Sequence, residues 1–139
     1  MEAVKYFNLN REVFMNDLIQ NYIGVLKKYA EFSGRARRRE LWLFVLCNII
    51  ISIVVSILGF IPVLGKIIYV LYLLYTLAIL IPSLAVGARR LHDTNKSGLF
   101  LLLGLIPLVG AIILIVFFAI EGDKGKNQYG PDPKGGAAA

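Results

Sequence analysis

Two adjacent residues, His92 and Asp93, form the most chemically suggestive pair in the 139-residue chain. A carboxylate can orient an imidazole or raise its pKa, which suits such a pair to general acid–base catalysis. Adjacent side chains usually point apart, however, and the sequence offers no second histidine and no clear serine or cysteine nucleophile beside them. We therefore assign no catalytic residue. We expect Asp93 to have a structural role, pairing with loop amides or with Arg89 or Arg90.

The arginines are the other residues whose chemistry suggests a function, and they flank long apolar runs. Guanidinium groups match phosphate oxygens in geometry, and each basic residue near an anionic membrane surface contributes ~1 kcal/mol of attraction. The same arginines also set membrane topology. Two interpretations stay open, namely topology alone, or topology combined with binding of anionic lipid, phosphate or a partner protein. The residues expected at such a contact are Arg35, Arg37, Arg38, Arg39, Arg89, Arg90 and His92.

Glu40 is the acidic residue at the edge of the first apolar run. We expect it to pair with an arginine, such as Arg89 or Arg90, and so to hold the first two membrane segments together at their cytoplasmic ends. No metal site and no cofactor is expected, because His92 is the only histidine and Cys47 the only cysteine.

The composition indicates that these residues belong to a membrane protein. Hydrophobic residues make up 58% of the chain, a larger fraction than in ordinary soluble domains. The mean hydropathy is correspondingly high, at +0.70. In so apolar a chain, the net charge of +6 indicates a basic cytoplasmic rim facing anionic lipid, rather than a surface for nucleic acid. We assign one domain to residues 1–134 and interpret residues 135–139 as a tail left by cloning.

Hydrophobic periodicity predicts an all-α membrane protein with an amino-terminal helix and three hydrophobic segments. Residues 10–31 place apolar side chains at helical spacing and predict an amphipathic helix at the membrane interface. Uncharged runs at 41–61 and 67–86 are long enough to span ~30 Å of hydrocarbon. A third apolar run covers residues 99–120.

Proline and glycine shape the ends of these runs. Pro82 is expected to kink or loosen the last turn of the second run, ahead of a polar loop at 88–98. Residues 104–110, GLIPLVG, resemble residues 59–65, GFIPVLG, where a turn joins the first two runs. The third run is therefore either a span kinked at proline or a re-entrant hairpin that turns at Pro107.

One face of the first span carries small polar residues at steps of four, namely Asn48, Ser52 and Ser56. Such stripes let helices approach closely and hydrogen-bond across their contact, so we interpret this face as a packing surface. The rival interpretation is a solute path. It would make the protein an oligomeric transporter or channel component, because three helices enclose little space.

The distribution of lysine and arginine predicts the orientation in the membrane. With the amino terminus in the cytoplasm, three straight spans leave 11 of these residues inside and 4 outside. A re-entrant third run leaves 14 inside and 1 outside. Both arrangements put the amino terminus and residues 88–98 in the cytoplasm, and the side on which the carboxy terminus lies stays open.

Three motifs carry a family resemblance. They are YAEFSGRARRRELW at 29–42, RRLHDT followed by Ser97-Gly98 at 89–98, and GKNQYGPDP at 125–133. In this order they resemble the signatures of the YhaH-like bacterial inner-membrane proteins, also called domain of unknown function 805. The resemblance covers residues 22–134. It implies a small helical protein of the inner membrane, in a family without an established activity, substrate or cofactor.

Together these features predict a small multi-pass protein of the bacterial inner membrane that is not an enzyme. Its basic cytoplasmic rim is expected to contact membrane lipids, particularly anionic ones, or a membrane protein partner, which includes a second copy of the chain. Nucleic acid is not an expected partner. A transporter or channel component is the alternative function, and an enzyme acting on lipid headgroups is the least favoured.

Overall fold

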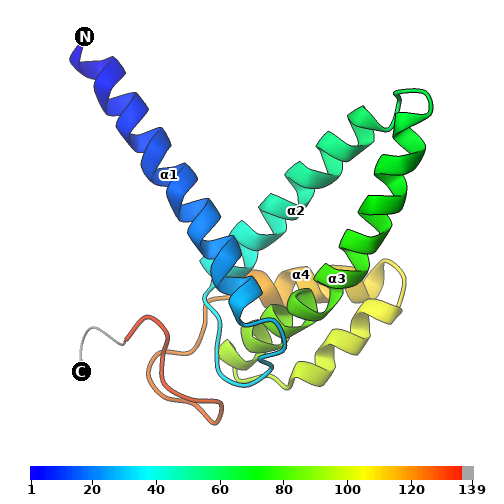
Figure 1. Cartoon of the computed structure of the whole chain (residues 1–139). Coiled ribbons are helices and arrows are strands. Elements are labelled where there is room, and N and C mark those ends of the chain that lie inside the picture. Colours follow the sequence, from blue (N-terminus) through cyan, green and yellow to red (C-terminus); the bar gives the residue numbers. More distant parts are fainter. Residues whose placement is uncertain (136–139) are drawn as a thin grey trace.

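The computed structural model describes residues 1–135, which form an all-α fold (Figure 1). Its helices are α1 (Glu2–Lys27), α2 (Arg38–Leu58), α3 (Leu64–Asp93), the 3-10 helix η1 (Gly98–Leu105) and α4 (Val109–Ala119). The predicted fold class is therefore confirmed. The tail assigned to residues 135–139 lies outside the described residues, apart from Gly135.

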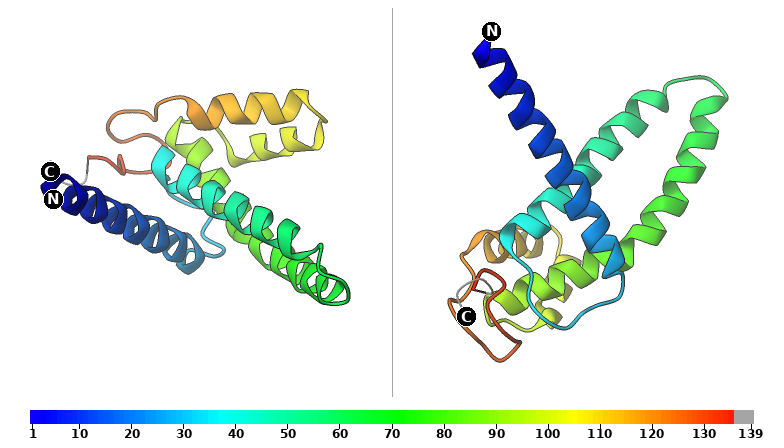
Figure 2. Two further views of the ribbon diagram at one scale, coloured as in Figure 1. Left: turned by 90° about the horizontal axis from the view of Figure 1, so that it is seen from above. Right: turned by 60° about the vertical axis from the view of Figure 1, so that its left-hand side comes forward.

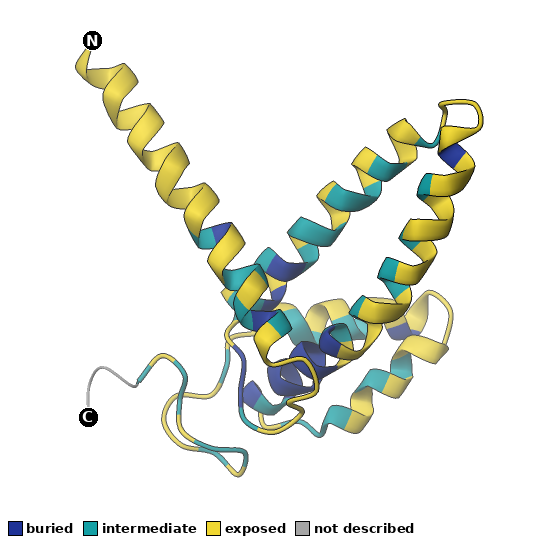
Figure 3. Cartoon of the chain, in the orientation of Figure 1, coloured by how far each residue is buried: buried dark blue, intermediate teal, exposed yellow. Residues whose placement is uncertain are grey.

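The helices diverge from one junction (Figures 1 and 2). α2 and α3 form a long hairpin, and η1 and α4 form a shorter one. α1 extends from the junction in a separate direction and diverges from the α2–α3 hairpin as the second arm of a V (Figure 1). Burial is concentrated at the junction, as Figure 3 shows, whereas the outer parts of α1 and of both hairpins are largely exposed. The core cluster at the junction consists of Val25, Ala36, Leu41, Phe44 and Val86. Apolar surface is thus exposed along the two hairpins, where a bilayer would cover it.

α1 differs from the amphipathic helix predicted at 10–31, because it covers Glu2–Lys27. It starts earlier because no proline or glycine precedes Gly24 to interrupt the helix. Its second half packs against the rest of the protein, where Tyr22 stacks on Phe44 of α2 with 5.3 Å between ring centroids. The apolar side chains of its first half are exposed. The position of α1 at a membrane interface stays a prediction.

α2 and α3 occupy the positions of the first two predicted spans, and both are long and apolar enough to cross a membrane. α2 begins among the arginines at Arg38 and ends at Leu58, before the turn at Pro62. It is therefore shifted toward the amino terminus relative to the predicted range of 41–61. α3 extends well beyond the predicted range of 67–86 and ends at Asp93. Most of the polar stretch after the second span is therefore helix, where the sequence predicted a loop.

Pro82, which was expected to kink or loosen the last turn, lies inside α3 and does not end it, because the helix continues to Asp93. The ribbon of α3 changes direction along its course (Figure 1). A proline lacks the N–H that would bond the carbonyl four residues earlier, here that of Ala78. The hydroxyl of Tyr29 donates to this carbonyl at 2.9 Å. This replacement hydrogen bond comes from the segment after α1, so it could not be recognised from the local sequence of α3.

The third apolar run is not one straight helix, because its chain turns after η1 and returns as α4. The turn repeats the one between α2 and α3. Val63 and Leu108 follow the two prolines and have φ angles of 66° and 62°. In each turn the next residue donates its N–H to the proline carbonyl over 2.7 Å, which closes a γ-turn. The sequence repeat therefore corresponds to a repeated turn, and the structure has the hairpin rather than the straight helix.

The face of α2 that carries small polar residues meets α3. Asn48 Oδ1 accepts from the hydroxyl of Tyr75 at 2.6 Å. Ser52 Oγ lies 2.6 Å from the hydroxyl of Tyr72. Ser56 instead donates to a carbonyl of its own helix and is exposed. Two of the three residues in the predicted stripe therefore lie in the contact between the helices.

Candidate functional site

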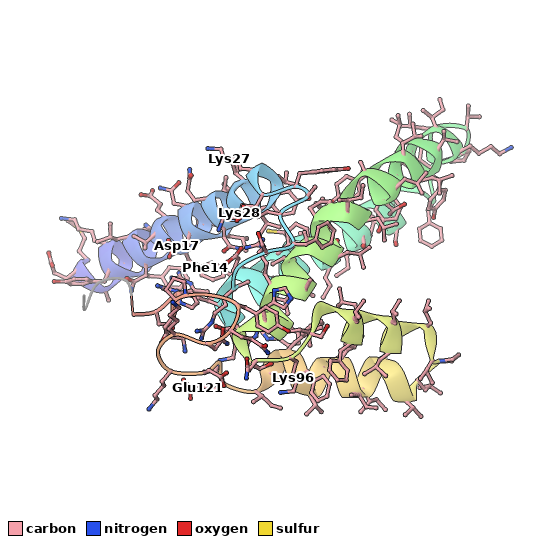
Figure 4. All side chains as sticks on the ribbon, turned by 90° about the horizontal axis from the view of Figure 1, so that it is seen from below. Phe14, Asp17, Lys27, Lys28, Lys96 and Glu121 are labelled. Atoms are coloured by element: carbon pink, nitrogen blue, oxygen red, sulfur yellow. The ribbon has the colours of Figure 1, made fainter. Side chains whose placement is uncertain are left out.

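Three segments that are distant in sequence meet at the junction, next to its apolar core. They are the linker between α1 and α2, the carboxy-terminal end of α3, and the segment that follows α4. We call the charged and polar region that they form the polar junction. Figure 4 shows side-chain nitrogen and oxygen atoms gathered there, with α1 and its Asp17, Lys27 and Lys28 on one side and the two hairpins on the other. Each of the three family motifs contributes one of these segments. Their convergence defines the candidate site.

Asp93 is the carboxylate at the centre of this site. Its Oδ1 accepts from Arg35 Nε at 2.9 Å, and its Oδ2 pairs with Arg90 Nη1. The side chains of the aspartate and both arginines are at most 3% exposed. Buried charges are tolerated only when they are paired and fully hydrogen-bonded, so the remaining guanidinium donors must also find partners.

Arg35 directs its other donors to the backbone of the carboxy-terminal segment. Its Nη1 donates to the carbonyl of Gly125 at 2.6 Å, and its Nη2 donates to the carbonyl of Asp123 at 2.5 Å. The same segment is tied to α3 directly, because the N–H of Asp123 donates to the carbonyl of Asp93 at 2.7 Å. Arg35 therefore connects the linker before α2 to both other segments.

Arg90 closes the carboxy-terminal end of α4. Its Nε donates to the carbonyl of Phe118 at 3.1 Å, and its Nη2 bonds the carbonyl of Ile120. The last carbonyls of a helix lack partners within the helix, and the helix dipole attracts cations to this end. Arg90 supplies both the donors and the charge, so this side chain ties the end of α4 to α3.

His92 and Asp93 have different partners and do not form a catalytic pair in this arrangement. The imidazole Nδ1 lies 3.0 Å from the carbonyl of Gly34, so this nitrogen carries the proton and donates it. The ring stacks on Tyr129, with 3.9 Å between centroids and 4° between planes. The backbone carbonyl of His92 accepts from Asn127 Nδ2 at 2.8 Å. His92 therefore joins the linker to the carboxy-terminal segment.

Arg89 and Glu40 connect α3 to α2. Arg89 Nη1 donates to Glu40 Oε1 at 2.6 Å, which is one of the two pairings expected from the sequence. Arg89 is buried, and its Nε and Nη2 have no hydrogen-bond partner among the described residues. Asn21 of α1 donates to the backbone carbonyl of Glu40 at 3.0 Å. Glu40 thus provides the counter-charge for a guanidinium that has few other interactions.

The seven residues expected at a lipid contact fall into different environments. Arg35, Arg89 and Arg90 are buried, and His92 is half-buried. The more accessible side chains are those of Arg37, Arg38 and Arg39. Arg37 Nε donates to the carbonyl of Pro133 at 2.8 Å, and Arg39 pairs with Asp17 at 2.5 Å.

Several residues of the site were not identified as such from the sequence. Asn127, Tyr129 and the carbonyls that accept from Arg35 lie in the segment after α4, to which the sequence assigned no contact residue. Asp132 shapes this segment by accepting from the N–H groups of Gly125 and Lys134 at 3.1 and 2.8 Å, which lowers the pKa of its carboxyl group. The available signal was the third family motif, which marks the segment without indicating its partners.

Comparisons with known proteins agree with the resemblance in the sequence. Residues 29–131 match the family described as Protein of unknown function (DUF805). The chain is 47% identical over 119 residues to Inner membrane protein YhaI of Escherichia coli (strain K12), covering 86% of this chain and 99% of the relative. It is 45% identical over 117 residues to Inner membrane protein YhaH of the same strain, covering 81% of this chain and 95% of that relative. No solved structure matches the chain significantly.

We predict that Asp93→Asn destabilises the protein, because it leaves the buried guanidinium groups of Arg35 and Arg90 without a counter-charge. Removing one partner of a buried ion pair typically costs ~3–5 kcal/mol. The expected result is a lower melting temperature in detergent and faster hydrogen exchange in residues 121–134. Asp17→Asn is the control, since its partly exposed ion pair with Arg39 is worth ~0–1 kcal/mol. Equal melting temperatures for the two variants would contradict this role of Asp93.

A second prediction concerns Glu40, whose loss leaves Arg89 buried without an ionic partner. Glu40→Ala is expected to lower the melting temperature in detergent more than Glu2→Ala, because Glu2 is exposed at the start of α1. Glu40→Gln distinguishes charge from hydrogen bonding, since it keeps a side-chain oxygen that accepts from Arg89 but removes the charge. The pairing would be unimportant if Glu40→Ala and Glu2→Ala melted at the same temperature.

Proposed function

The chain belongs to the DUF805 family of proteins of unknown function, and from this premise we propose that it is a non-enzymatic inner-membrane module whose basic cytoplasmic rim binds anionic lipid. One observation carries the proposal: both apolar hairpins leave the same polar junction, and in the views from above and below they point away from α1 (Figure 2, left, and Figure 4). A membrane surface at the junction would cover both hairpins with hydrocarbon and leave the charged groups in water.

The lengths of the hairpins support this orientation. α2 has 21 residues, or ~31 Å of helix, which suits a full crossing of ~30 Å of hydrocarbon. α4 has 11 residues, or ~16 Å, so the η1–α4 hairpin enters the membrane and returns without crossing it. In this topology the amino terminus, the junction and the carboxy-terminal segment are cytoplasmic. The cytoplasmic side of the membrane then holds 14 of the 15 lysine and arginine residues, as expected for a cytoplasmic face.

The accessible arginines at the start of α2 are the proposed lipid contact. Arg37, Arg38 and Arg39 stand where α2 enters the proposed hydrocarbon layer, so their guanidinium groups would lie at the depth of the phosphates. These three arginines also bond within the chain, but their side chains remain accessible. The buried arginines are out of reach of a lipid and stabilise the fold. A membrane protein partner, or a second copy of the chain, is the alternative ligand for the same rim.

The alternative function, an oligomeric transporter or channel component, draws on the polar contact between α2 and α3. There the hydroxyl of Tyr75 bonds both Asn48 and Tyr22, so these groups satisfy one another. This pattern favours a packing role over a path for solute. An enzyme acting on lipid headgroups has the least support, because His92 and Asp93 are engaged with separate partners.

The proposed topology predicts a cytoplasmic carboxy terminus. In a Cys47→Ser background, a single cysteine introduced at the exposed position Gln128 should react with an impermeant thiol reagent only after cell lysis. Lys66→Cys in the same background is the matched control, because Lys66 is exposed in the first turn of α3, next to the turn that joins α2 and α3, and should label in intact cells. Labelling of the Gln128→Cys protein from outside would exclude the re-entrant arrangement of η1 and α4.

The proposed lipid contact predicts selective stabilisation by phosphatidylglycerol. This lipid should raise the melting temperature of the purified protein more than phosphatidylcholine does, because each accessible arginine adds ~1 kcal/mol of attraction to an anionic surface. Replacing Arg37, Arg38 and Arg39 together with glutamine should remove most of the difference. Replacing them with lysine keeps the positive charge and should therefore keep the difference in melting temperature between the two lipids. An undiminished difference in the glutamine variant would refute the contact.

A further inference from the structure

A groove separates the two hairpins. It is an open, mainly apolar space of ≈ 480 Å³, with α2 and α3 on one side and η1 and α4 on the other. Its size falls within the range of about 300–1,000 Å³ that is typical of ligand pockets. The divergence of the hairpins around it is visible in Figures 2 and 4. Its walls include Leu41, Val45, Gly87, Gly104, Leu114 and Phe118.

The polar groups in the groove wall are already hydrogen-bonded within the chain. Asn48 donates to the carbonyl of Phe44 at 2.8 Å and accepts from Tyr75. Ser83 donates to the carbonyl of Ile79 at 2.7 Å. Few donors or acceptors remain for a polar solute, which would lose its own hydration on entering. A hydrocarbon chain requires no hydrogen bond and gains dispersion contacts along the apolar walls.

One cationic side chain, that of Arg38, stands next to the groove walls at the start of α2. Arg38 lies one turn before the wall residue Leu41, and its Nη1 donates to the carbonyl of Ala119 at 3.3 Å. It therefore bridges the ends of α2 and α4, which form opposite walls. The Arg38 side chain is 42% exposed and lies 3.5 Å from Glu121, which is also 3.2 Å from Lys134. Arg38, Lys134 and Glu121 together carry one net positive charge beside the end of α4, which we call the mouth of the groove.

We propose that the groove holds one acyl chain of an anionic phospholipid, whose phosphate contacts Arg38 and Lys134. This inference rests on the proposed contact between the rim and anionic lipid, and it adds a defined site for the lipid tail. The positive mouth complements the phosphate, and the apolar walls complement the hydrocarbon. The bound chain fills the space between the diverging hairpins and so contributes to the contact between α2 and α4.

Native mass spectrometry of the full chain tests this site. The detergent-purified protein is supplied with equal amounts of phosphatidylglycerol and phosphatidylcholine that carry the same acyl chains. Ser83→Phe puts an aromatic ring into the groove and should reduce the retention of both lipids several-fold. Thr76→Phe is the matched control, because Thr76 lies on the same helix, bonds a carbonyl of that helix and is outside the groove wall. Arg38→Gln should remove the preference for phosphatidylglycerol.

A monomer with one bound phospholipid, lost in Ser83→Phe and kept in Thr76→Phe, supports the site. Equal retention by these two variants, each with wild-type helix content by circular dichroism, overturns it. A lipid-free dimer also overturns it, in favour of a second copy as the occupant. Where Ser83→Phe fails to fold, Gly104→Leu narrows the groove from the opposite wall and is judged by the same outcomes.

The same spectra separate this inference from the proposed function. If replacing Arg37, Arg38 and Arg39 with glutamine abolishes the preference for phosphatidylglycerol while Ser83→Phe retains lipid normally, the rim binds lipid and the groove does not. If that triple variant keeps the preference, the proposed function itself is overturned.

Discussion

The pairing of Asp93 with Arg35 and Arg90 is the interaction on which the rest of the structure depends. A guanidinium group has five donors, and one carboxylate cannot occupy all of them on two arginines. The remaining donors bond backbone carbonyls at the end of α4 and in the segment after it. The cost of burying these charges is thereby offset by ordering irregular backbone. The same contacts attach the η1–α4 hairpin and the carboxy-terminal segment to α3.

Outside this cluster, the architecture follows from the need to satisfy every backbone polar group inside a hydrocarbon layer. Pro82 leaves one carbonyl without its helical donor, and Tyr29 supplies the missing hydrogen bond. The two prolines at the hairpin ends produce the same γ-turn twice. A side chain on Gly65 or Gly110, just after these turns, would overlap the backbone of the preceding element. The two proline turns are therefore closed locally, whereas the break at Pro82 is closed by a side chain from the segment after α1.

The arginines divide into two groups by environment, and this division connects the fold to the proposed function. The buried group stabilises the junction, while Arg37, Arg38 and Arg39 stay accessible at the start of α2. Mutations of the accessible group should therefore affect lipid contact more than folding, because their partners are exposed while those of the buried arginines are not. The polar junction also sets the depth at which the hairpins enter the proposed bilayer, because its charges cannot follow them into hydrocarbon.

The sequence by itself determined the fold class and the two long apolar helices, because these features depend on local periodicity. The GLIPLVG repeat indicated a turn as one of two possibilities, and the structure decided between them. The sequence also indicated Glu40 and Asp93 as partners for arginine, since isolated carboxylates beside apolar runs need counter-charges. Only the tertiary structure decided which arginines are buried, and that α3 passes through Pro82. These outcomes depend on contacts between residues some 50 to 90 positions apart, which no local pattern specifies.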